Sequence, residues 1–191
     1  MAVKSGRLFV VSGPSGVGKT TLLKMLLDKF NHRFCFSVSY TSRNKREGEV
    51  DGIDYFFITK EEFEEKIKSN FFIEHAIVHG HYYGTSRGFI DKVINSGTNC
   101  LLDIDVQGSV QLMSKKINAE YIFIAPPSFE DLKKRLTSRS TETKEEIDLR
   151  LENAKNELAL KDKYSNVIIN DDLNRAYKEL ENIFFRLEKK A

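Results

Sequence analysis

The amino-acid sequence predicts an α/β fold: a parallel sheet flanked by helices, with an inserted α+β lobe and a helical lid. A glycine-rich loop, residues 13–20, stands between a short apolar run and a helix-like segment. Four more apolar runs alternate with helix-like segments, which is typical of a parallel sheet covered on both faces. Residues 39–88 and 129–156 differ in composition from this alternation, so we interpret them as inserts.

Length and composition limit the class of protein. The chain has 191 residues, 40% of them hydrophobic, which suits one domain with a sizeable core. No apolar run approaches the ~18 residues of a membrane span, and the N-terminus lacks the apolar stretch of a signal peptide. The net charge of +2 gives no sign of nucleic-acid binding. We expect a cytoplasmic protein with neither membrane nor nucleic acid as partner; the choice between monomer and homo-oligomer stays open.

The core elements follow in order along the chain. The expected strands are residues 7–12, 34–38, 99–106, 120–125 and 166–170. After the first strand, apolar residues recur at helical spacing at Leu22, Leu23, Leu26, Leu27 and Phe30. The last helix has one apolar stripe, made of Leu173, Tyr177, Leu180, Phe184 and Leu187. Two cysteines in separate apolar runs predict buried thiols rather than a disulfide or metal site; they are Cys35 and Cys100.

The two inserts interrupt this core. The lobe at 39–88 is rich in Arg, Tyr and Gly, and contains expected strands at 55–58 and 71–78 and a charged helix at 60–68. The insert at 129–156 is charged and helical, with capping-box spacing between Thr143 and Glu146. Little apolar stripe is visible in it, which fits a solvated face or a mobile lid. The single domain, residues 6–186, therefore has a core at about 6–38, 89–128 and 157–190.

The glycine-rich loop carries the strongest chemical signal. It matches G-x-x-x-x-G-K-S/T, the phosphate loop of nucleotide triphosphate-binding proteins. The glycines let the main chain approach a ligand, and successive N–H groups form a nest for anionic oxygens. Lys19 adds a charge beside the β- and γ-phosphates, and the Thr20 hydroxyl suits Mg²⁺ bound with ATP. The expected ATP-binding loop comprises Gly13, Pro14, Ser15, Gly16, Val17, Gly18, Lys19 and Thr20.

A second phosphate site is expected in the lobe. Arg43 and Arg46 stand three residues apart in a polar loop, and arginine forks bind phosphate oxygens bidentately. With Tyr55 and the segment 82–85, they indicate a pocket for a second phosphate. The alternative for the arginine segment is an ordinary solvated loop.

Three carboxylates stand in apolar surroundings. Glu74 lies in the expected strand 71–78, where a carboxylate is costly unless it has a partner. It could accept hydrogen bonds from guanine N1–H and the exocyclic amine, or be a partly exposed acid. Asp103 and Asp105 alternate along an expected strand and so face one side. An acid at that place helps hold Mg²⁺ in phosphate-loop proteins, the alternative being a strand-end cap.

Basic residues and histidines complete the candidates. Arg135, Arg139 and Arg150 lie in the charged insert, where they either stabilise a transferring phosphoryl group or form weak surface pairs. Three histidines raise the question of a metal site, but a strand and a turn would have to bring them together. We therefore interpret them as half-exposed strand and turn residues; they are His75, His79 and His81.

The whole pattern resembles the guanylate kinase family. The likeness runs from about residue 6 to residue 186. Besides the phosphate loop it includes residues 36–43, 46–49, 52–56, 72–74, 82–85, 102–108 and 169–173. The resemblance implies the reaction ATP + GMP giving ADP + GDP with Mg²⁺, on a P-loop core with a GMP-binding lobe and a lid. A phosphate loop alone indicates only a nucleotide, whereas the combination is specific.

The resemblance also assigns roles to residues. It implies that the catalytic groups are Lys19, Arg43, Arg135, Arg139, Arg150 and Asp103. It implies that GMP is bound by Ser39, Arg43, Arg46, Tyr55, Glu74, Tyr83, Thr85, Asp103 and Asp105. Asn170 and Asp171 would lie near the adenine of ATP. Lys45 stands where many relatives have proline, and Ser140 and Lys144 depart from the usual lid sequence, which bears on lid kinetics rather than on the reaction class.

Other functions fit parts of the sequence. One is a kinase for a different monophosphate, such as dAMP or dTMP. Another is a non-catalytic guanylate-kinase-like module that binds phosphopeptides, although such modules typically lack a working ATP loop. A P-loop GTPase is disfavoured because the chain has no Asn-Lys-x-Asp motif for the base.

Overall fold

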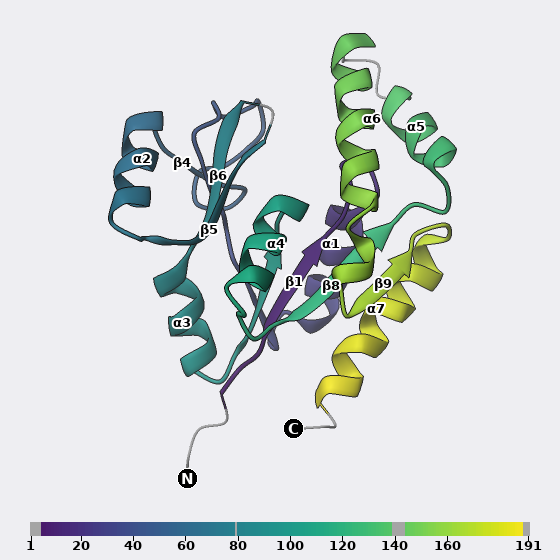
Figure 1. Cartoon of the computed structure of the whole chain (residues 1–191). Coiled ribbons are helices and arrows are strands. Elements are labelled where there is room, and N and C mark those ends of the chain that lie inside the picture. Colours follow the sequence, from purple (N-terminus) through teal and green to yellow (C-terminus); the bar gives the residue numbers. More distant parts are fainter. Residues whose placement is uncertain (1–4, 79, 139–143, 189–191) are drawn as a thin grey trace. The chain divides into compact units, whose positions relative to one another are not determined.

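The structure is a computed structural model that describes residues 5–78, 80–138 and 144–188 (Figure 1). The chain divides into two compact units. The first consists of Met1–Val10 with Arg33–Ala119, and the second of Val11–His32 with Glu120–Ala191. Among the helices of the described ranges, none combines the length and apolarity needed to cross a bilayer.

A five-stranded sheet forms the core. Its strands are β1 (Leu8–Ser12), β2 (Phe34–Phe36), β7 (Asn99–Asp103), β8 (Glu120–Ala125) and β9 (Asn166–Ile169). The spatial order is β2-β7-β1-β8-β9, and the pairs β2–β7 and β8–β9 are parallel. β1 contributes three residues to the first unit and two to the second, and all five are buried. The predicted parallel sheet is confirmed, since continuous apolar strands are buried on both faces.

Helices pack against the strands within each unit. The first unit has α3 (Arg87–Asn95) and α4 (Val106–Ser114), and the second has α1 (Lys19–Phe30) and α7 (Leu173–Glu188). α1 and α7 lie together: the Lys29 ammonium is 2.7 Å from a carboxylate oxygen of Glu181. The rings of Phe30 and Phe185 are in edge-to-face contact beside them, with centroids 5.5 Å apart. A short 3₁₀ helix, Lys161–Lys163, precedes β9.

The inserted lobe has its own sheet in the first unit. Its strands are β3 (Tyr40–Thr41), β4 (Phe56–Phe57), β5 (Phe72–Val78) and β6 (His81–Ser86), in the spatial order β4-β3-β6-β5. The helix α2 (Lys60–Lys68) follows β4 (Figure 1). α2 begins at Thr59 with a capping box that Glu62 completes. Phe63 from α2 is fully buried and its ring is 4.4 Å from the ring of Phe72.

The charged insert forms two helices, α5 (Phe129–Thr137) and α6 (Lys144–Leu158). The expectation of little apolar stripe is wrong. Buried leucines from both helices and an alanine make one cluster, with members Leu132, Leu136, Leu151 and Ala154. The apolar stripe is divided between the two helices, so neither shows it alone. The expected capping position Thr143 lies outside the described residues.

Other expectations need correction at their ends. The strand predicted at 99–106 stops at Asp103, because Asp105 is the N-cap of α4 and accepts the N–H of Gly108 at 2.7 Å. Asp103 and Asp105 therefore do not alternate along one strand. Cys35 and Cys100 are neighbours in register across β2 and β7, and both are free thiols. Cys100 is fully buried, which raises the pKa of its thiol to about 12, and Cys35 is half-buried.

Candidate active site

The phosphate loop joins β1 to α1 in the second unit. Gly13 has φ +146°, and a Cβ there would lie 2.2 Å from the carbonyl oxygen of Ile124. Gly18 has φ +97°, and a Cβ there would lie 2.5 Å from Nδ2 of Asn170. α1 starts at Lys19 without a side-chain cap, so the N–H groups of its first turn face an anion-binding position. Backbone geometry and close packing both require glycine at these places.

The two side chains that end the loop motif have oxygen and nitrogen atoms suited to a nucleotide with Mg²⁺. The Lys19 ammonium bridges the loop, 2.7 Å from the carbonyl oxygen of Gly13 and 3.5 Å from that of Pro14. Thr20 is exposed in the first turn of α1. Mg²⁺ prefers oxygen ligands, so the Thr20 hydroxyl fits this ion chemically. Asp103 is a half-buried carboxylate of the first unit and has oxygen atoms of the same kind.

Two arginines of the charged insert reach the same loop. Arg135 donates from Nη1 to the carbonyl of Val17 at 3.3 Å and from Nη2 to the carbonyl of Asn170 at 2.8 Å. Arg150 donates from Nη2 to the Ser15 hydroxyl at 2.5 Å. The structure therefore brings two of the three predicted arginines to the phosphate loop. Arg139 lies outside the described residues.

The predicted adenine residues differ in their surroundings. Asn170 is 5% exposed, and its amide donates to the carbonyl of Val17 at 2.7 Å. Asp171 is exposed and forms an ion pair with Arg175. The backbone N–H of Asp172 and this arginine lower the pKa of the Asp171 carboxyl. Asn170 thus holds the phosphate loop through its hydrogen bond to Val17, while Asp171 lies at the surface.

In the first unit, Arg43 is the centre of a polar network in the lobe. Its Nη1 and Nη2 donate to Oε2 and Oε1 of Glu49 at 3.0 and 2.7 Å, and its Nε donates to the Tyr83 hydroxyl at 3.2 Å. The guanidinium also lies over the Tyr55 ring, 5.5 Å from its centroid. Hydrogen bonding to Arg43 is the main reason that the pKa of Glu49 is lowered. The network fixes one face of Arg43 and its tyrosines.

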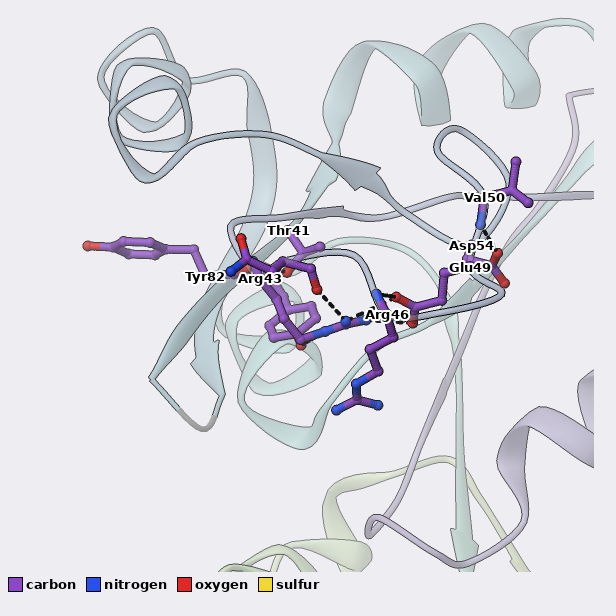
Figure 2. A network of polar contacts seen from close by, with 9 residues as sticks. Thr41, Arg43, Arg46, Glu49, Val50, Asp54 and Tyr82 are labelled. Atoms are coloured by element: carbon purple, nitrogen blue, oxygen red, sulfur yellow. Dashed lines mark hydrogen bonds and ion pairs between the residues drawn. The ribbon is translucent and has the colours of Figure 1, made fainter. Parts of the chain in front are cut away.

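Glu49 was missed by the sequence reasoning. Its carboxylate accepts from the backbone N–H of Arg46 at 2.7 Å as well as from the Arg43 side chain. Figure 2 shows that the Arg46 side chain extends away from this network, with its guanidinium at the far end. An acid three residues after one arginine and six after another was the available signal, but it reads as an ordinary charged loop.

A buried carboxylate stands on β5 in the same unit. Glu74 is 3% exposed, and its Oε1 accepts the Thr85 hydroxyl at 2.5 Å across the β5–β6 pair. Burial, and then the charge of Asp105, raises the pKa of Glu74 to about 7, against the opposing effects of Thr85 and Lys115. Glu74 is therefore not the partly exposed acid that the sequence left open.

The other residues expected to bind the second phosphate and its base lie in the same unit. The pKa of Tyr55 is raised mainly by burial, with smaller contributions from Tyr83 and Asp103. The Tyr55 and Tyr83 rings make an edge-to-face contact at 5.7 Å. Ser39 is half-buried, and its carbonyl accepts the N–H of Phe56 at 2.9 Å. The charges of Arg43 and Asp103 thus both act on Tyr55, which also contacts Tyr83.

The histidines are not gathered in the described part of the chain. His75 lies on β5 opposite Gly84, and burial lowers the pKa of its imidazole. His81 is exposed at the start of β6, and His79 lies outside the described residues. In residues 5–78, 80–138 and 144–188, no group of three or more His, Cys, Asp or Glu side chains could hold a metal ion.

Comparison of this chain with known proteins shows its family. The guanylate kinase family model covers residues 5–187. A guanylate kinase of Thermotoga maritima is 46% identical over 93% of this chain and 86% of its own length. That of Schizosaccharomyces pombe is 48% identical over 91% of this chain and 88% of its own. The crystal structure of guanylate kinase from Anaplasma phagocytophilum has a TM-score of 0.77 at 33% identity, over 97% and 87% of the two chains. The chain belongs to the guanylate kinase family.

Proposed function

We propose that this chain transfers the γ-phosphoryl group of ATP to GMP, giving ADP and GDP, and so supplies guanine nucleotides. The observation that carries the proposal is Glu74, a buried carboxylate on β5 whose Oε1 accepts the Thr85 hydroxyl. Its oxygens match the N1–H and exocyclic amine of guanine. Burying a carboxylate is costly unless it is well hydrogen-bonded, so a ligand with two donors would add to the one hydrogen bond from Thr85.

The donor half-site lies in the second unit. The loop Gly13–Thr20 holds the phosphates of ATP, and Lys19 neutralises the β- and γ-phosphates. Thr20 would hold Mg²⁺ bound with ATP, and the ion would supply charge neutralisation at the phosphate oxygens. Arg135 and Arg150 already reach the loop, so with Arg139 they stabilise the transferring group. Asn170 and Asp171 lie near the adenine of ATP.

The acceptor half-site lies in the lobe, residues 39–88. Arg43 keeps its Glu49 and Tyr83 contacts and turns its remaining donor capacity to the GMP phosphate. Arg46 supplies a second fork, and Tyr55 and Tyr83 add hydroxyl donors. The guanine base is read by Ser39, Glu74, Thr85 and Asp105. Asp103 would help to hold Mg²⁺ and to orient the arginines.

No protein nucleophile is needed for the chemistry. A GMP phosphate oxygen attacks the γ-phosphorus in line, the bond from phosphorus to the ADP oxygen breaks, and ADP leaves with that electron pair. Positioning and charge neutralisation carry the catalysis. Residues 129–156 act as a lid. The cluster of three buried leucines and Ala154 joins its two helices. Lid closure would exclude water, which suppresses ATP hydrolysis.

The experiment is label transfer from ATP carrying ³²P in its γ-phosphate. With GMP and Mg²⁺, we expect the label in GDP and little free phosphate. Label found mainly in free phosphate would make the protein an ATPase. No turnover by folded protein that binds ATP would favour the binding-module alternative. The complete phosphate loop, with its glycines in the required backbone conformations, favours transfer.

A further inference from the structure

The outer edge of β5 is covered by side chains of α4. β5 is the last strand of its sheet, in the order β4-β3-β6-β5, so no strand of the described ranges lies beside one of its edges. Three side chains from α4 and its C-cap donate to carbonyls along β5. Gln107 reaches Ile77 at 3.5 Å, Gln111 reaches His75 at 2.6 Å, and Lys115 reaches Ile73 at 2.8 Å. We call Gln107, Gln111 and Lys115 the polar row.

The geometry of helix and strand explains why this row fits. Its members are four residues apart, which is a rise of about 6 Å along a helix. The carbonyls are two residues apart, which is about 6.6 Å along a strand. The two series run in opposite directions and stay in step over three contacts. One helix face therefore replaces a neighbouring strand, which also protects the edge from unwanted pairing.

Glu74 lies between two of these contacts. Gln111 also accepts the His75 N–H at Oε1, at 3.4 Å, so it contacts both backbone groups of the residue that follows Glu74. Lys115 binds the residue that precedes it. The pairing of β5 with β6 shifts register between Phe72 and Glu74, and such a bulge re-aims nearby side chains. The polar row therefore holds the backbone at the point where the direction of Glu74 is set.

A glycine on α4 makes the contact closer still. A Cβ on Gly108 would lie 2.3 Å from Oε2 of Glu74 and 3.0 Å from its Cδ. The helix backbone therefore lies against the carboxylate itself. Gly108 stands three residues before Gln111, on the same side of the helix. Backbone contacts and the Gly108 surface both limit where the Glu74 oxygens can be.

We propose that α4 positions Glu74 through the polar row and Gly108, and that Gln111 thereby sets the preference for guanine over a base without the 2-amino group. Gln111 is a positioning residue, since it acts on Glu74 through the backbone of His75. The inference rests on the proposed function, in which Glu74 accepts both guanine donors. Both donors are accepted only while both carboxylate oxygens are held in place, so a displaced carboxylate would weaken its hydrogen bond to the 2-amino group.

The test compares GMP with inosine monophosphate, which keeps N1–H but lacks the amine. Gln111→Met keeps the length of the side chain and removes both hydrogen bonds. We expect the ratio of kcat/KM for GMP to that for inosine monophosphate to fall about tenfold, the value of one hydrogen bond to a charged group. The KM for ATP should stay within about twofold. Lys92→Ala, an exposed change on α3 of the same unit, should leave the ratio unchanged.

Two further variants make the outcome decisive. Gly108→Ala adds a methyl group against Glu74 while favouring the helix, so it should fold and lower the ratio even if Gln111→Met does not fold. Glu74→Gln tests the proposed function itself. A normal ratio in both α4 variants, with a reduced ratio in Glu74→Gln, overturns the inference and leaves the function standing. An unchanged ratio in Glu74→Gln overturns both. Equal losses toward GMP and ATP in Gln111→Met would mark a general structural defect and contradict positioning.

Discussion

Glu74→Gln should stabilise the fold while damaging its use of GMP. The side chain is 3% exposed, and burial is the main cause that raises the pKa of its carboxyl from 4.5 to about 7. The folded protein therefore favours the protonated, neutral carboxyl. Glutamine has the same shape, stays neutral at every pH, and can still accept the Thr85 hydroxyl through its amide oxygen.

The size of the effect follows from the pKa change. Each pKa unit corresponds to 1.36 kcal/mol, so a rise from 4.5 to about 7 amounts to roughly 3 kcal/mol. A raised carboxyl pKa contributes stability that is fully present below the unfolded pKa and is lost as pH rises through the folded pKa. Ionised Glu74 thus lowers the free energy of unfolding by roughly 3 kcal/mol at pH 8 and by almost nothing at pH 4.

Urea unfolding of the wild type and Glu74→Gln, without nucleotides, measures this directly. We expect the variant to be more stable at pH 8 by roughly 3 kcal/mol, with the difference shrinking toward zero near pH 4. Its kcat/KM for GMP should fall at least tenfold, because the new amide presents a donor to the guanine amine. A stability difference that is absent at pH 8, or equal at all pH values, would refute the reasoning.

Three other perturbations have expected outcomes. Lys19→Ala should abolish transfer while GMP still binds, as calorimetry can show, because the lost ammonium belongs to the donor half-site. The wild-type kcat/KM for GMP should fall about tenfold between pH 8 and pH 6 as Glu74 is protonated, and a flat rate profile would contradict this. Leu136→Ala should lower the free energy of unfolding by about 2–5 kcal/mol in urea titrations, since the side chain is fully buried. Leu149→Ala, at a half-exposed leucine of α6, should change it by less than about 0.5 kcal/mol.

Local patterns in the sequence were enough for much of the fold. The phosphate loop was recognisable because its motif positions need either a glycine backbone conformation or a group that binds phosphate or Mg²⁺. Gly13 and Gly18 have the positive φ angles that favour glycine. The helix Lys60–Lys68 and the strand Glu120–Ala125 have the predicted bounds. Each has a clear end signal: a capping box at one and a proline pair after the other.

Features that depend on distant parts of the chain were missed. The Asp103-x-Asp105 spacing suits a strand, and only the cap on Gly108 shows that a helix begins there. The strand β6 has Tyr, Gly, Thr and Ser in place of an apolar run, because its stability comes from pairing on both sides. Glu49 reads as a solvated charge until Arg43 is placed beside it. Such contacts are properties of the tertiary fold.

The measurement that tests the central claim most directly is ADP production from ATP and Mg²⁺ with separate acceptors: GMP, dGMP, AMP, CMP, UMP and dTMP. We predict turnover with GMP, allow it with dGMP because the base is the same, and expect rejection of the other bases by several orders of magnitude. Comparable turnover with AMP or a pyrimidine monophosphate would contradict the role of Glu74 as the reader of guanine, although the chain would remain a kinase.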